Sequence, residues 1–485
     1  MDSRGIRKEL NRFEEKYPVY NWEVDGFYIW PYLRFQIGAA LITQGKMEKS
    51  RSSLRRLLDS FLKSLWAFIK DFNANEKVDK CDYLFWGNGV HSASINGEIY
   101  HARTDPLIEK LRERKYTVRK ILIGNKYETP RKIKSFFVQP KLNFILVMSS
   151  LKYKLLQFDP AMSLRGYEDF LKDIQALGID SKSFKKESLK RNVYIMFRYK
   201  AYFKKLLSKF KPKALFMVCY YSTPGFTMIS ACKELSIPVI DIQHGIQGDY
   251  HYAYGSWGNY SLSQEQSVLP DVFYVWSEEE AKSISKWKPD SMKVFIGGND
   301  YLKMWQFGGN AQVQNYIDDI SSKYNLSSYE KVVFYTLGGF DVVDENIVQA
   351  LIDSPKNWLW IIRMHPKKTD VVDAWEERLR DAKGDYLIEG IEKVPLYLLM
   401  RVSDIHVTER SSTVMEAQEF GLHSIVTDPE APILYESYLK SGNTVFAESS
   451  REILDYIKKL EKSKIEPKEG EDSDIGRLLE LINDI

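Results

Sequence analysis

The chain has 485 residues, which is too long for one ordinary hydrophobic core and therefore indicates two domains. Hydrophobic residues make up 44% of the sequence and charged residues 28%, a balance that excludes both global disorder and a lipid-embedded helix bundle. The formal net charge of +3 is small for this length, so it does not indicate a nucleic-acid partner.

The cysteines and the first residues of the chain indicate the cellular compartment in which the protein works. Cys81, Cys219 and Cys232 contain no CxxC pair and are odd in number, which argues against a disulfide framework or a zinc knuckle and favours a reducing cytosol. The stretch MDSRGIRKEL lacks the apolar core of a signal peptide, and no apolar run approaches the roughly 20 residues of a spanning helix. We therefore expect a cytoplasmic protein, with any membrane contact peripheral and on the inner face.

Two segments concentrate positive charge. Residues 182–213 contain twelve Lys or Arg against a single acid, Glu187, and their apolar residues recur at near-helical spacing. Residues 50–72 follow the same pattern. Each segment has two interpretations: an amphipathic helix that rests on an anionic leaflet, or a helix that packs on a sheet and only solvates its outer face.

The first half alternates strand-like and helical stretches. The aromatic-rich residues 17–37 come first, and we expect them to form a layer beside the first sheet. Strand-like runs then begin near residues 81, 116, 213, 237 and 271, with helices predicted at 105–114 and 224–235. This alternation is typical of βαβ units and a parallel sheet.

The second half repeats the alternation more regularly. Six apolar runs each precede a predicted helix: KVVFYTLGG, WLWIIRMHP, DYLIEG, DIHVTERSS, HSIVTD and NTVFAES. The glycine pair at 297–298 precedes a stretch without a clear sheet element, so we predict a first domain over 1–297 and a second domain over 298–485. A last helix at 473–484 is predicted to cross back onto the first domain. The fold class is α/β, with two Rossmann-type doubly wound parallel-sheet domains facing a cleft.

Ligands of open parallel sheets bind beyond the carboxyl ends of the strands, so the residues that follow each strand are the candidate site. Gly338 and Gly339 follow the first strand of the second domain, where they would let a phosphate approach the backbone; the alternative is a simple turn. The next strand ends in a basic His-Pro step made of Arg363, His365, Pro366 and Lys367. This step is either a phosphate contact or a solvated basic loop.

The stretch DIHVTERSSTVMEAQEFG is the strongest signal. The N-terminal end of a predicted helix is formed by Arg410, Ser411, Ser412 and Thr413. Hydroxyl groups and free backbone amides at this end would hold an anion. Glu416 lies about one turn further and would accept ribose hydroxyls. The alternative is structural, because Thr413 and Glu416 have the spacing of a capping box.

The first domain offers the stretch IDIQHGIQGDY. Gln243, His244 and Gly245 end a strand, and an imidazole there suits a general base for an acceptor hydroxyl or a donor to the leaving phosphate. Asp249 and His251 follow on the same loop and would assist. The alternative is a histidine that only hydrogen-bonds its own loop.

Two acids of the first domain compete for the role of base. Glu98 and Asp105 follow the first strand, close in sequence to His91, in a loop long enough to reach an acceptor. Asp105 also suits the N-cap of the helix that starts ahead of Pro106.

These motifs resemble those of GT-B glycosyltransferases. The order of a glycine-containing loop, a strand ending in His-Pro and ERSSTVMEAQEFG followed by HSIVTD is similar to bacterial capsule and surface-polysaccharide enzymes, including sialyltransferases and Kdo-transferases. It is also similar to the glycerophosphotransferases of teichoic-acid synthesis. The resemblance covers the last third of the chain, together with IDIQHG and LPDVFYVWS.

The resemblance implies that His365 contacts the donor phosphate or nucleotide and that Ser411 and Ser412 hold phosphate. The chain lacks the acidic Asp/Glu-Asp/Glu-Gly motif of sialyltransferases, so the donor and the base stay open. No Asp-x-Asp motif stands at a suitable strand end, and we expect no metal and no cofactor, with the nucleotide sugar as co-substrate.

The predicted function is the transfer of a sugar from a CMP-, UDP- or GDP-activated donor to a glycan or lipid-linked acceptor in surface-polysaccharide synthesis. Three alternatives share the fold: glycerol-phosphate transfer from a CDP donor, nucleotide-sugar epimerisation, and a nucleotide-sugar-binding component without catalysis. No nucleic-acid partner is expected.

Overall fold

The computed structural model describes residues 1–43, 80–95, 97–124, 130–156, 158–255, 257–258, 268–306, 311–338, 344–364, 372–380, 382–388, 394–464 and 474–485. The chain forms two compact units. Unit 1 comprises Met1–Ser92, Tyr100–Gly298 and Asp472–Ile485, and unit 2 comprises Ala93–Ile99 and Asn299–Glu471. The sequence-based boundaries differ from this division in three places, because Gly298 and residues 472–485 group with unit 1 and residues 93–99 group with unit 2. The return of the last helix to the first domain agrees with the prediction for 473–484.

Unit 1 is built on a seven-stranded, fully parallel sheet in the order β12-β11-β10-β9-β3-β6-β7. Its strands are β3 (Tyr83–Asn88), β6 (Val118–Ile123), β7 (Phe136–Phe137), β9 (Ala214–Val218), β10 (Val239–Ile242), β11 (Val272–Val275) and β12 (Lys293–Ile296). The five predicted strands of this half are confirmed. Strand β12 was not predicted, and its residues are less buried than those of β11 beside it.

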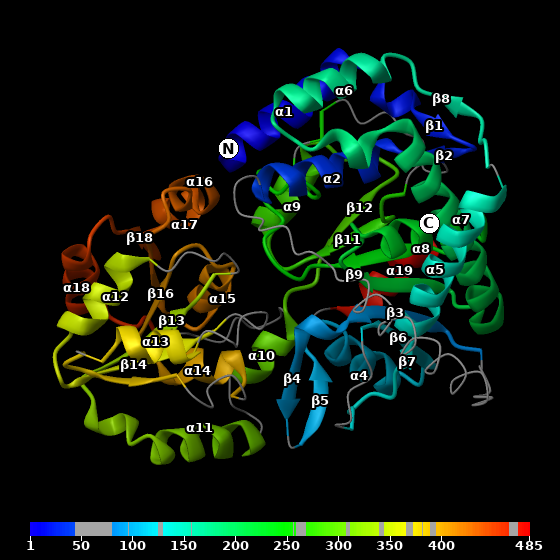
Figure 1. Ribbon diagram of the computed structural model, residues 1–485. Coiled ribbons are helices and arrows are strands. Elements are labelled where there is room, and N and C mark those ends of the chain that lie inside the picture. Colours follow the sequence, from blue (N-terminus) through cyan, green and yellow to red (C-terminus); the bar gives the residue numbers. More distant parts are fainter. Residues whose placement is uncertain are drawn as a thin grey trace. The chain divides into compact units, whose positions relative to one another are not determined.

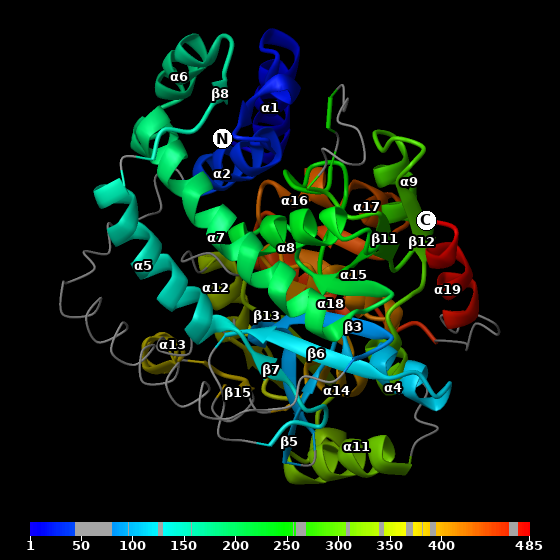
Figure 2. The same ribbon diagram turned by 90° about the vertical axis from the view of Figure 1, so that its right-hand side faces the viewer.

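Successive side chains of each strand point to opposite faces of this sheet, because a β-strand has a period of two residues. Leu84 and Trp86 of β3 enter one core with α7 (Lys186–Phe210) and α8 (Thr223–Glu234), and α5 (Gln139–Leu156) packs against α7 on the same side, as Figure 2 shows. Tyr83 and Phe85 enter the opposite core with α4 (Asp105–Glu113) and α19 (Ile475–Asn483). Burial of one face of α19 in that core explains why the chain end belongs to unit 1.

The aromatic N-terminal stretch forms a separate layer of unit 1, visible at the top of Figure 1. It consists of α1 (Ser3–Lys16), α2 (Trp30–Thr43) and α6 (Tyr167–Ala176) with a small antiparallel sheet of β2 (Phe27–Tyr28), β1 (Glu23–Val24) and β8 (Met162–Ser163). Trp22, Trp30 and Phe170 meet there with edge-to-face rings. A hairpin of β4 (Ser92–Ile95) and β5 (Glu98–His101) follows β3, and α9 (Glu278–Ser285) precedes β12.

Unit 2 contains a six-stranded, fully parallel sheet in the order β15-β14-β13-β16-β17-β18. The strands are β13 (Lys331–Thr336), β14 (Trp358–Arg363), β15 (Asp385–Leu387), β16 (Ile405–Thr408), β17 (His423–Val426) and β18 (Thr444–Phe446). All six predicted strands of this half are present, so two doubly wound parallel sheets are confirmed.

The helices of unit 2 lie on both sides of its sheet. Helices α12 (Glu345–Asp353) and α18 (Ser450–Lys459) pack together over a core with β13 and β14. The remaining helices are α10 (Asp300–Gln306), α11 (Ala311–Lys323), α13 (Val372–Arg378), α14 (Leu396–Val402), α15 (Thr413–Glu419), α16 (Ala431–Leu434) and α17 (Glu436–Lys440).

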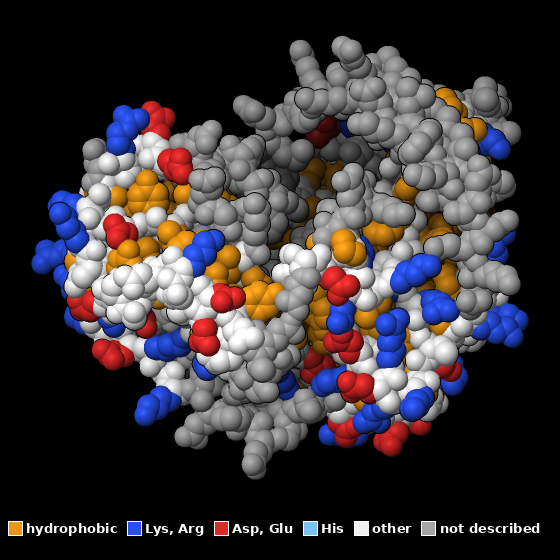
Figure 3. Space-filling view, turned by 90° about the horizontal axis from the view of Figure 1, so that it is seen from below, with side chains coloured by type: hydrophobic (Ala, Val, Ile, Leu, Met, Phe, Trp, Pro, Cys, Tyr) orange, Lys and Arg blue, Asp and Glu red, His pale blue; other side chains and the backbone are white. Residues whose placement is uncertain are grey.

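The surface charges and the helix lengths bear on partners. On the face shown in Figure 3, Lys and Arg side chains lie among Asp and Glu side chains. Within the described parts of the chain, no helix combines the length and apolarity needed to cross a bilayer. Helix α7 buries the apolar face of the first basic segment, while the second basic segment, 50–72, falls outside the described residues.

Candidate functional site

Each sheet has one point where the strand order reverses. In unit 1 the chain starts at β3, proceeds to β6 and β7 on one side, and returns to β9 on the other side. In unit 2 it starts at β13, proceeds to β14 and β15, and returns to β16. Ligands of doubly wound sheets bind beyond the carboxyl ends of the strands at such a point. The candidate positions are therefore the loops after β3 and β9 and the loops after β13 and β16.

Four of the seven histidines gather near the reversal point of unit 1. His91 follows β3, and its ring centroid lies 5.3 Å from that of His244, which follows β10, and 6.2 Å from that of His101. Tyr221, which follows β9, places its Oη 3.0 Å from His244 Nε2 and its ring 5.4 Å from that of His251. The structure thus brings the predicted His244 to the reversal point, together with groups from three strand ends.

A buried carboxyl supports the other side of the His244 ring. The Tyr254 hydroxyl donates to Asp241 Oδ2 (2.7 Å) and lies 3.5 Å from His244 Nδ1. The backbone N–H of Tyr220 donates to Asp241 Oδ1 (3.2 Å), so both carboxyl oxygens are engaged. Tyr221 and Tyr254 therefore contact opposite nitrogens of one imidazole, which restrains the orientation of the ring.

Burial sets the protonation states of this cluster. It lowers the pKa of His244 well below the usual value, and the neighbouring His91, His251 and Arg103 lower it further. Burial also lowers the pKa of His101 to about 3 and that of His251 to about 4. Because these imidazoles are neutral at pH 7, His244 is present in the form that accepts a proton.

Asp241 shows the opposite shift, because burial raises its pKa to about 8. We expect the free energy of unfolding to fall as pH rises from about 4 to about 8, by up to about 1.4 kcal/mol per pH unit. The reason is that the folded carboxyl keeps a proton that the unfolded carboxyl has already released. Asp241→Asn should make this decline shallower in urea titrations at a series of pH values.

A matched control is Asp82→Asn, because hydrogen bonds from Thr117 and Lys213 lower the pKa of Asp82 to about 2, outside this pH window. Its slope between pH 4 and pH 8 should equal that of the unaltered protein. Parallel slopes for Asp241→Asn and the unaltered protein would show that no proton is held at Asp241.

The other residues predicted on the acceptor side hold the loop. The Gln243 side chain is buried, donates to the Gly245 carbonyl (2.9 Å) and accepts from the Trp276 N–H (2.6 Å). Asp249 accepts from Ser283 Oγ (2.6 Å) and Lys286 Nζ (2.6 Å) and is thereby tied to α9.

His251 likewise turns toward its own loop. Its Nδ1 accepts from the N–H groups of Ala253 (3.1 Å) and Tyr254 (3.3 Å). These contacts hold the loop around His244, which contains Gln243, Gly245, Asp249 and His251. In the described contacts Asp249 has no direct role beside the imidazole.

The two competing acids lie in different surroundings. Asp105 is fully buried, forms an ion pair with Lys120 (2.5 Å) and accepts from the His101 N–H (2.9 Å). Thr104, not Asp105, is the N-cap of α4, so the predicted cap is wrong by one residue. Glu98 lies on β5 in the segment 93–99 that groups with unit 2. These contacts favour a structural role for Asp105.

In unit 2, Glu409 joins the two loops at the reversal point. Its Oε2 accepts from the N–H of Gly338 (3.1 Å), which follows β13, and its Oε1 accepts from the Tyr335 hydroxyl. Burial raises the pKa of Glu409. The predicted Gly338 thus lies in a loop that is held against the end of β16.

Arg410 is paired with acids of the neighbouring loop. Its guanidinium lies 3.4 Å from Asp428 Oδ2 and 2.9 Å from Glu430 Oε1, and only 10% of its side chain is exposed. Ser411 donates its N–H to Thr408 Oγ1 (3.2 Å) and accepts the Tyr435 hydroxyl at its carbonyl (2.7 Å). The hydroxyl groups of Ser411 and Ser412 belong to half-buried residues at the start of α15.

The capping-box alternative for Thr413 and Glu416 is wrong. Ser412 is the N-cap of α15, and its side chain makes no capping hydrogen bond. The Thr413 hydroxyl instead lies 2.9 Å from Thr336 Oγ1 and 3.2 Å from His406 Nε2. Glu416 is buried and accepts the Tyr397 hydroxyl.

Arg363, at the end of β14, donates to the Val394 carbonyl. Gly339, His365, Pro366 and Lys367 lie outside the described residues. Among the residues that the structure does describe, no cluster of three His, Cys, Asp or Glu could hold a metal ion.

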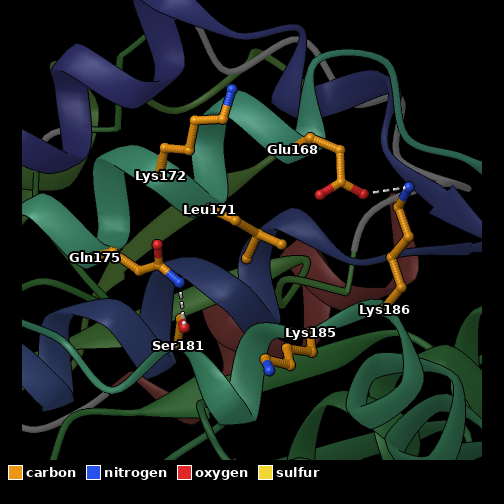
Figure 4. Close-up of a pocket in the computed structure, with 7 residues that line it drawn as sticks. All are labelled: Glu168, Leu171, Lys172, Gln175, Ser181, Lys185 and Lys186. Carbon is orange, nitrogen blue, oxygen red and sulfur yellow. Dashed lines mark hydrogen bonds and ion pairs between the residues drawn. The ribbon is translucent and has the colours of Figure 1, made fainter.

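A separate surface pocket of about 330 Å³ opens in unit 1, away from the strand ends. As Figure 4 shows, it is lined by residues of α6 and of the stretch 181–186 that leads into α7: Glu168, Leu171, Lys172, Gln175, Ser181, Lys185 and Lys186. Lys186 is paired with Glu168 (2.6 Å), and Gln175 donates to Ser181 Oγ (2.8 Å). The polar groups of this pocket mostly satisfy one another.

Several residues of the site were missed by the sequence analysis, including Tyr221, Asp241, Tyr254 and Glu409. A signal existed for Tyr221 and Glu409, because both lie within three residues after the end of a strand, as His244 does. In the sequence, Asp241 lies within an apolar strand and Tyr254 lies in a loop, so neither residue is marked as part of a site. The two side chains meet only because the loop folds back onto the strand.

No protein-family profile matches the chain, and no curated protein matches its sequence. Solved structures do match its fold. The S. aureus MnaA–UDP co-structure covers 84% of this chain and 98% of its own chain, with 15% identity and a TM-score of 0.50. UDP-GlcNAc 2-epimerase from Neisseria meningitidis bound to UDP-GlcNAc covers 78% and 90%, with 15% identity and a TM-score of 0.48. The wall teichoic acid polymerase TagF covers 84% and 89%, with 11% identity and a TM-score of 0.46. The chain has a GT-B-type fold of two Rossmann-like domains.

Proposed function

We propose that the protein is a glycosyltransferase that moves a sugar from a nucleotide-activated donor to a glycan or lipid-linked acceptor in surface-polysaccharide synthesis. The observation that carries the proposal is the neutral imidazole of His244, restrained on both nitrogens at the reversal point of unit 1. A general base for an acceptor hydroxyl requires this protonation state and a fixed orientation.

The proposal assigns the nucleotide donor to unit 2. Its phosphates would lie against the backbone at Gly338 and the hydroxyls of Ser411 and Ser412, where the strand order reverses. Gly339, Arg363, His365, Pro366, Lys367, Arg410, Thr413 and Glu416 complete the proposed donor set. The fold likeness to a structure that holds UDP supports a nucleotide ligand.

The proposal assigns the acceptor to unit 1. The Tyr221 hydroxyl marks the place where a proton donor meets His244 Nε2, at 3.0 Å. An acceptor hydroxyl there would give its proton to the imidazole as its oxygen bonds to the anomeric carbon. The bond from that carbon to the phosphate oxygen breaks, and the nucleotide leaves with the electron pair. Backbone N–H groups and His365 would stabilise the negative charge on the leaving phosphate. Arg410 would contribute by exchanging its ion pairs with Asp428 and Glu430 for the phosphate.

A nucleotide that binds only the folded protein raises its melting temperature. We expect one of CMP, CDP, UDP or GDP to do so in a thermal-shift assay, with about 2.7 kcal/mol of stabilisation at a hundred times its dissociation constant. Replacing Ser411 and Ser412 by alanine should reduce the shift, whereas Ser441→Ala, in the turn before β18 at the amino ends of the strands, should not. Failure of all four nucleotides to raise the melting temperature would contradict the donor assignment.

Nucleotide release separates the alternatives. With a donor sugar and an acceptor glycan or lipid, a glycosyltransferase releases nucleotide only when the acceptor is present. Conversion of the donor without an acceptor would indicate an epimerase, and transfer from CDP-glycerol would indicate a glycerophosphotransferase. Binding without either reaction would indicate a non-catalytic component.

A further inference from the structure

A cation lies beside the imidazoles at the reversal point of unit 1. Arg103 lies in the turn between β5 and α4, and its Cζ is 4.6 Å from the centre of the Trp276 ring. The Trp276 N–H donates to the side chain of Gln243 (2.6 Å), the residue before His244. This chain of contacts places a guanidinium, stacked on an aromatic ring, against the loop that carries the proposed base.

The turn that carries Arg103 is held on both sides. His101 Nε2 lies 2.8 Å from the Asn88 carbonyl, and His101 Nδ1 lies 2.9 Å from the Thr104 hydroxyl. The His101 N–H donates to the carboxylate of Asp105 (2.9 Å), the first residue of α4. Both His101 and Thr104 are fully buried. The backbone at Arg103 therefore has a fixed position relative to the strand ends.

His91 brings a further nitrogen to the same place. Its ring lies edge-to-face against that of His244, with the two centroids 5.3 Å apart. The rings of His101 and His244 are hydrogen-bonded, whereas the His91 ring has no hydrogen-bond partner among the described residues. His91, Arg103 and His244 are each only partly buried, so a ligand can reach them from solvent. These three residues are called the Arg103 cluster below.

The charge that acts on these rings is positive. Burial lowers the pKa of both His91 and His244, and the cation of Arg103 lowers both further. Within the described parts of the chain no acid contributes to the shift of His91. The two buried acids at these strand ends supply no negative charge to the rings, because Asp105 forms an ion pair in the core and Asp241 keeps its proton at pH 7.

This environment opposes the proton transfer that the proposed mechanism requires. A proton accepted by His244 would create an imidazolium near the Arg103 cation, and two like charges at close range repel. A base whose pKa lies well below neutral is also a weak base. A negative charge bound beside both groups would offset the repulsion and raise the pKa of the imidazole. A neutral substrate would leave the base weak, whereas an anionic one strengthens it.

We propose that the Arg103 cluster binds an oxyanion, a phosphate or a carboxylate, which the acceptor carries close to its reacting hydroxyl. Stacking on Trp276 covers one face of the guanidinium, and the N–H groups at its edge donate to the oxyanion. The His91 ring donates one further hydrogen bond. This inference rests on the proposed function, since it names the class of acceptor as an acidic or phosphorylated glycan or lipid.

The test is titration of the full-length protein with inorganic phosphate, followed by NMR of ¹⁵N-labelled histidines. We expect phosphate to move the imidazole resonances of His91 and His244 and to raise the pKa of both, and sodium chloride at equal ionic strength to do neither. His406 reports on unit 2, because its ring contacts Thr336 and Thr413 beside the proposed donor contacts. Movement of the His406 resonance alone would overturn the proposal. Acetate, titrated in the same way, supports a carboxylate if it binds more tightly than phosphate and a phosphorylated acceptor if it binds more weakly.

Two variants of Arg103 separate the guanidinium from its charge. Arg103→Gln should weaken phosphate binding at His91 and His244 by about tenfold to a hundredfold, from the loss of hydrogen bonds to a charged group. Arg103→Lys keeps the charge but loses the planar fork, so its loss should be smaller. The matched control is Arg198→Gln, which removes one exposed guanidinium from α7 and should bind as the unaltered protein does. Equal weakening by Arg103→Gln and Arg198→Gln would overturn the proposal.

The result is kept separate from the proposed function by measuring nucleotide binding on the same variants, with melting temperatures to show that they fold. A protein that binds nucleotide while phosphate leaves His91 and His244 unmoved would refute the oxyanion site alone. Phosphate binding at these rings, with no binding of any nucleotide, would refute the sugar transfer and support the oxyanion site. If Arg103→Gln weakens nucleotide binding as much as phosphate binding, the oxyanion is the phosphate of the donor, and the assignment to the acceptor is overturned.

Discussion

Replacing His244 by alanine should lower turnover by about 10²- to 10⁴-fold and leave nucleotide binding intact. The size of the effect follows from the loss of a positioned proton acceptor. Nucleotide binding is spared because the proposed donor contacts belong to unit 2, whereas His244 follows β10 of unit 1. The two readouts are the rate of nucleotide release with acceptor present and the dissociation constant of the nucleotide.

A second variant separates catalysis from loop support. His244→Gln keeps a hydrogen-bonding group near Tyr221 and Tyr254, which contact the two ring nitrogens. If the imidazole only holds its loop, this variant should stay active; if it accepts a proton, His244→Gln should be as slow as His244→Ala. Loss of nucleotide binding in both variants would refute the assignment of roles.

The pH profile provides an independent check on the same residue. Burial lowers the pKa of His244 below its usual value, so the imidazole stays neutral in acid that would charge an exposed histidine. The acidic limb of kcat/KM should therefore lie below pH 6.5, the ordinary value for histidine. Tyr254→Phe, which breaks the contact to Asp241, should move this limb and lower kcat more than it raises KM.

Replacing Arg34 by methionine should destabilise the protein by about 3–5 kcal/mol. Arg34 Nε lies 2.9 Å from Glu14 Oε1, and the two side chains are 1% and 0% exposed. Removing the guanidinium leaves a buried carboxylate without its counter-charge. The same guanidinium donates to the carbonyls of Tyr252 and Gly255 (3.4 Å for the latter) and lies 4.3 Å from the Trp257 ring.

Arg34 thereby anchors the loop that carries Tyr254 and His251. Helix α2 packs closely on this loop at Gly38, where a Cβ would lie 2.6 Å from the Tyr252 ring. We expect Arg34→Met to lower turnover as well, because Tyr254 loses the support of its loop. The N-terminal layer thus takes part in shaping the site, although it contributes no group to the reaction.

The measurement is urea unfolding, with a double variant and a surface control. Arg34→Met/Glu14→Leu removes both charges, so its loss of stability should be smaller than that of Arg34→Met alone. Lys213→Met breaks an exposed ion pair with Asp82 (3.0 Å), with the lysine 61% exposed, and should change stability by less than about 1 kcal/mol. Equal losses for Arg34→Met and Lys213→Met would contradict a role for burial.

Local pattern alone predicted most of the secondary structure. Runs such as KVVFYT and WLWIIR are apolar on both faces and are followed by glycine or proline. This pattern is typical of strands that are buried between two layers of helices. Position at a strand end singled out His244 and Gly338, and both lie at the point where the strand order of their sheet reverses. Strand β12 was not predicted because it lies at the edge of its sheet and is only partly buried.

Tertiary structure decided which strand ends are neighbours and which polar groups are already engaged. Thr413 and Glu416 have the spacing of a capping box, but Thr336, His406 and Tyr397 from other elements take their hydrogen bonds instead. In the sequence, Asp105 resembles an unpaired acid in a loop. In the structure, Lys120 of β6 forms an ion pair with it in the core. The sequence by itself determined the two parallel sheets, because strands buried on both faces are apolar throughout and the helices between them are apolar on one side. The adjacency of β3 and β9, and with it the meeting of His91, Tyr221 and His244, arises from pairings between distant segments, which leave no local pattern in the chain.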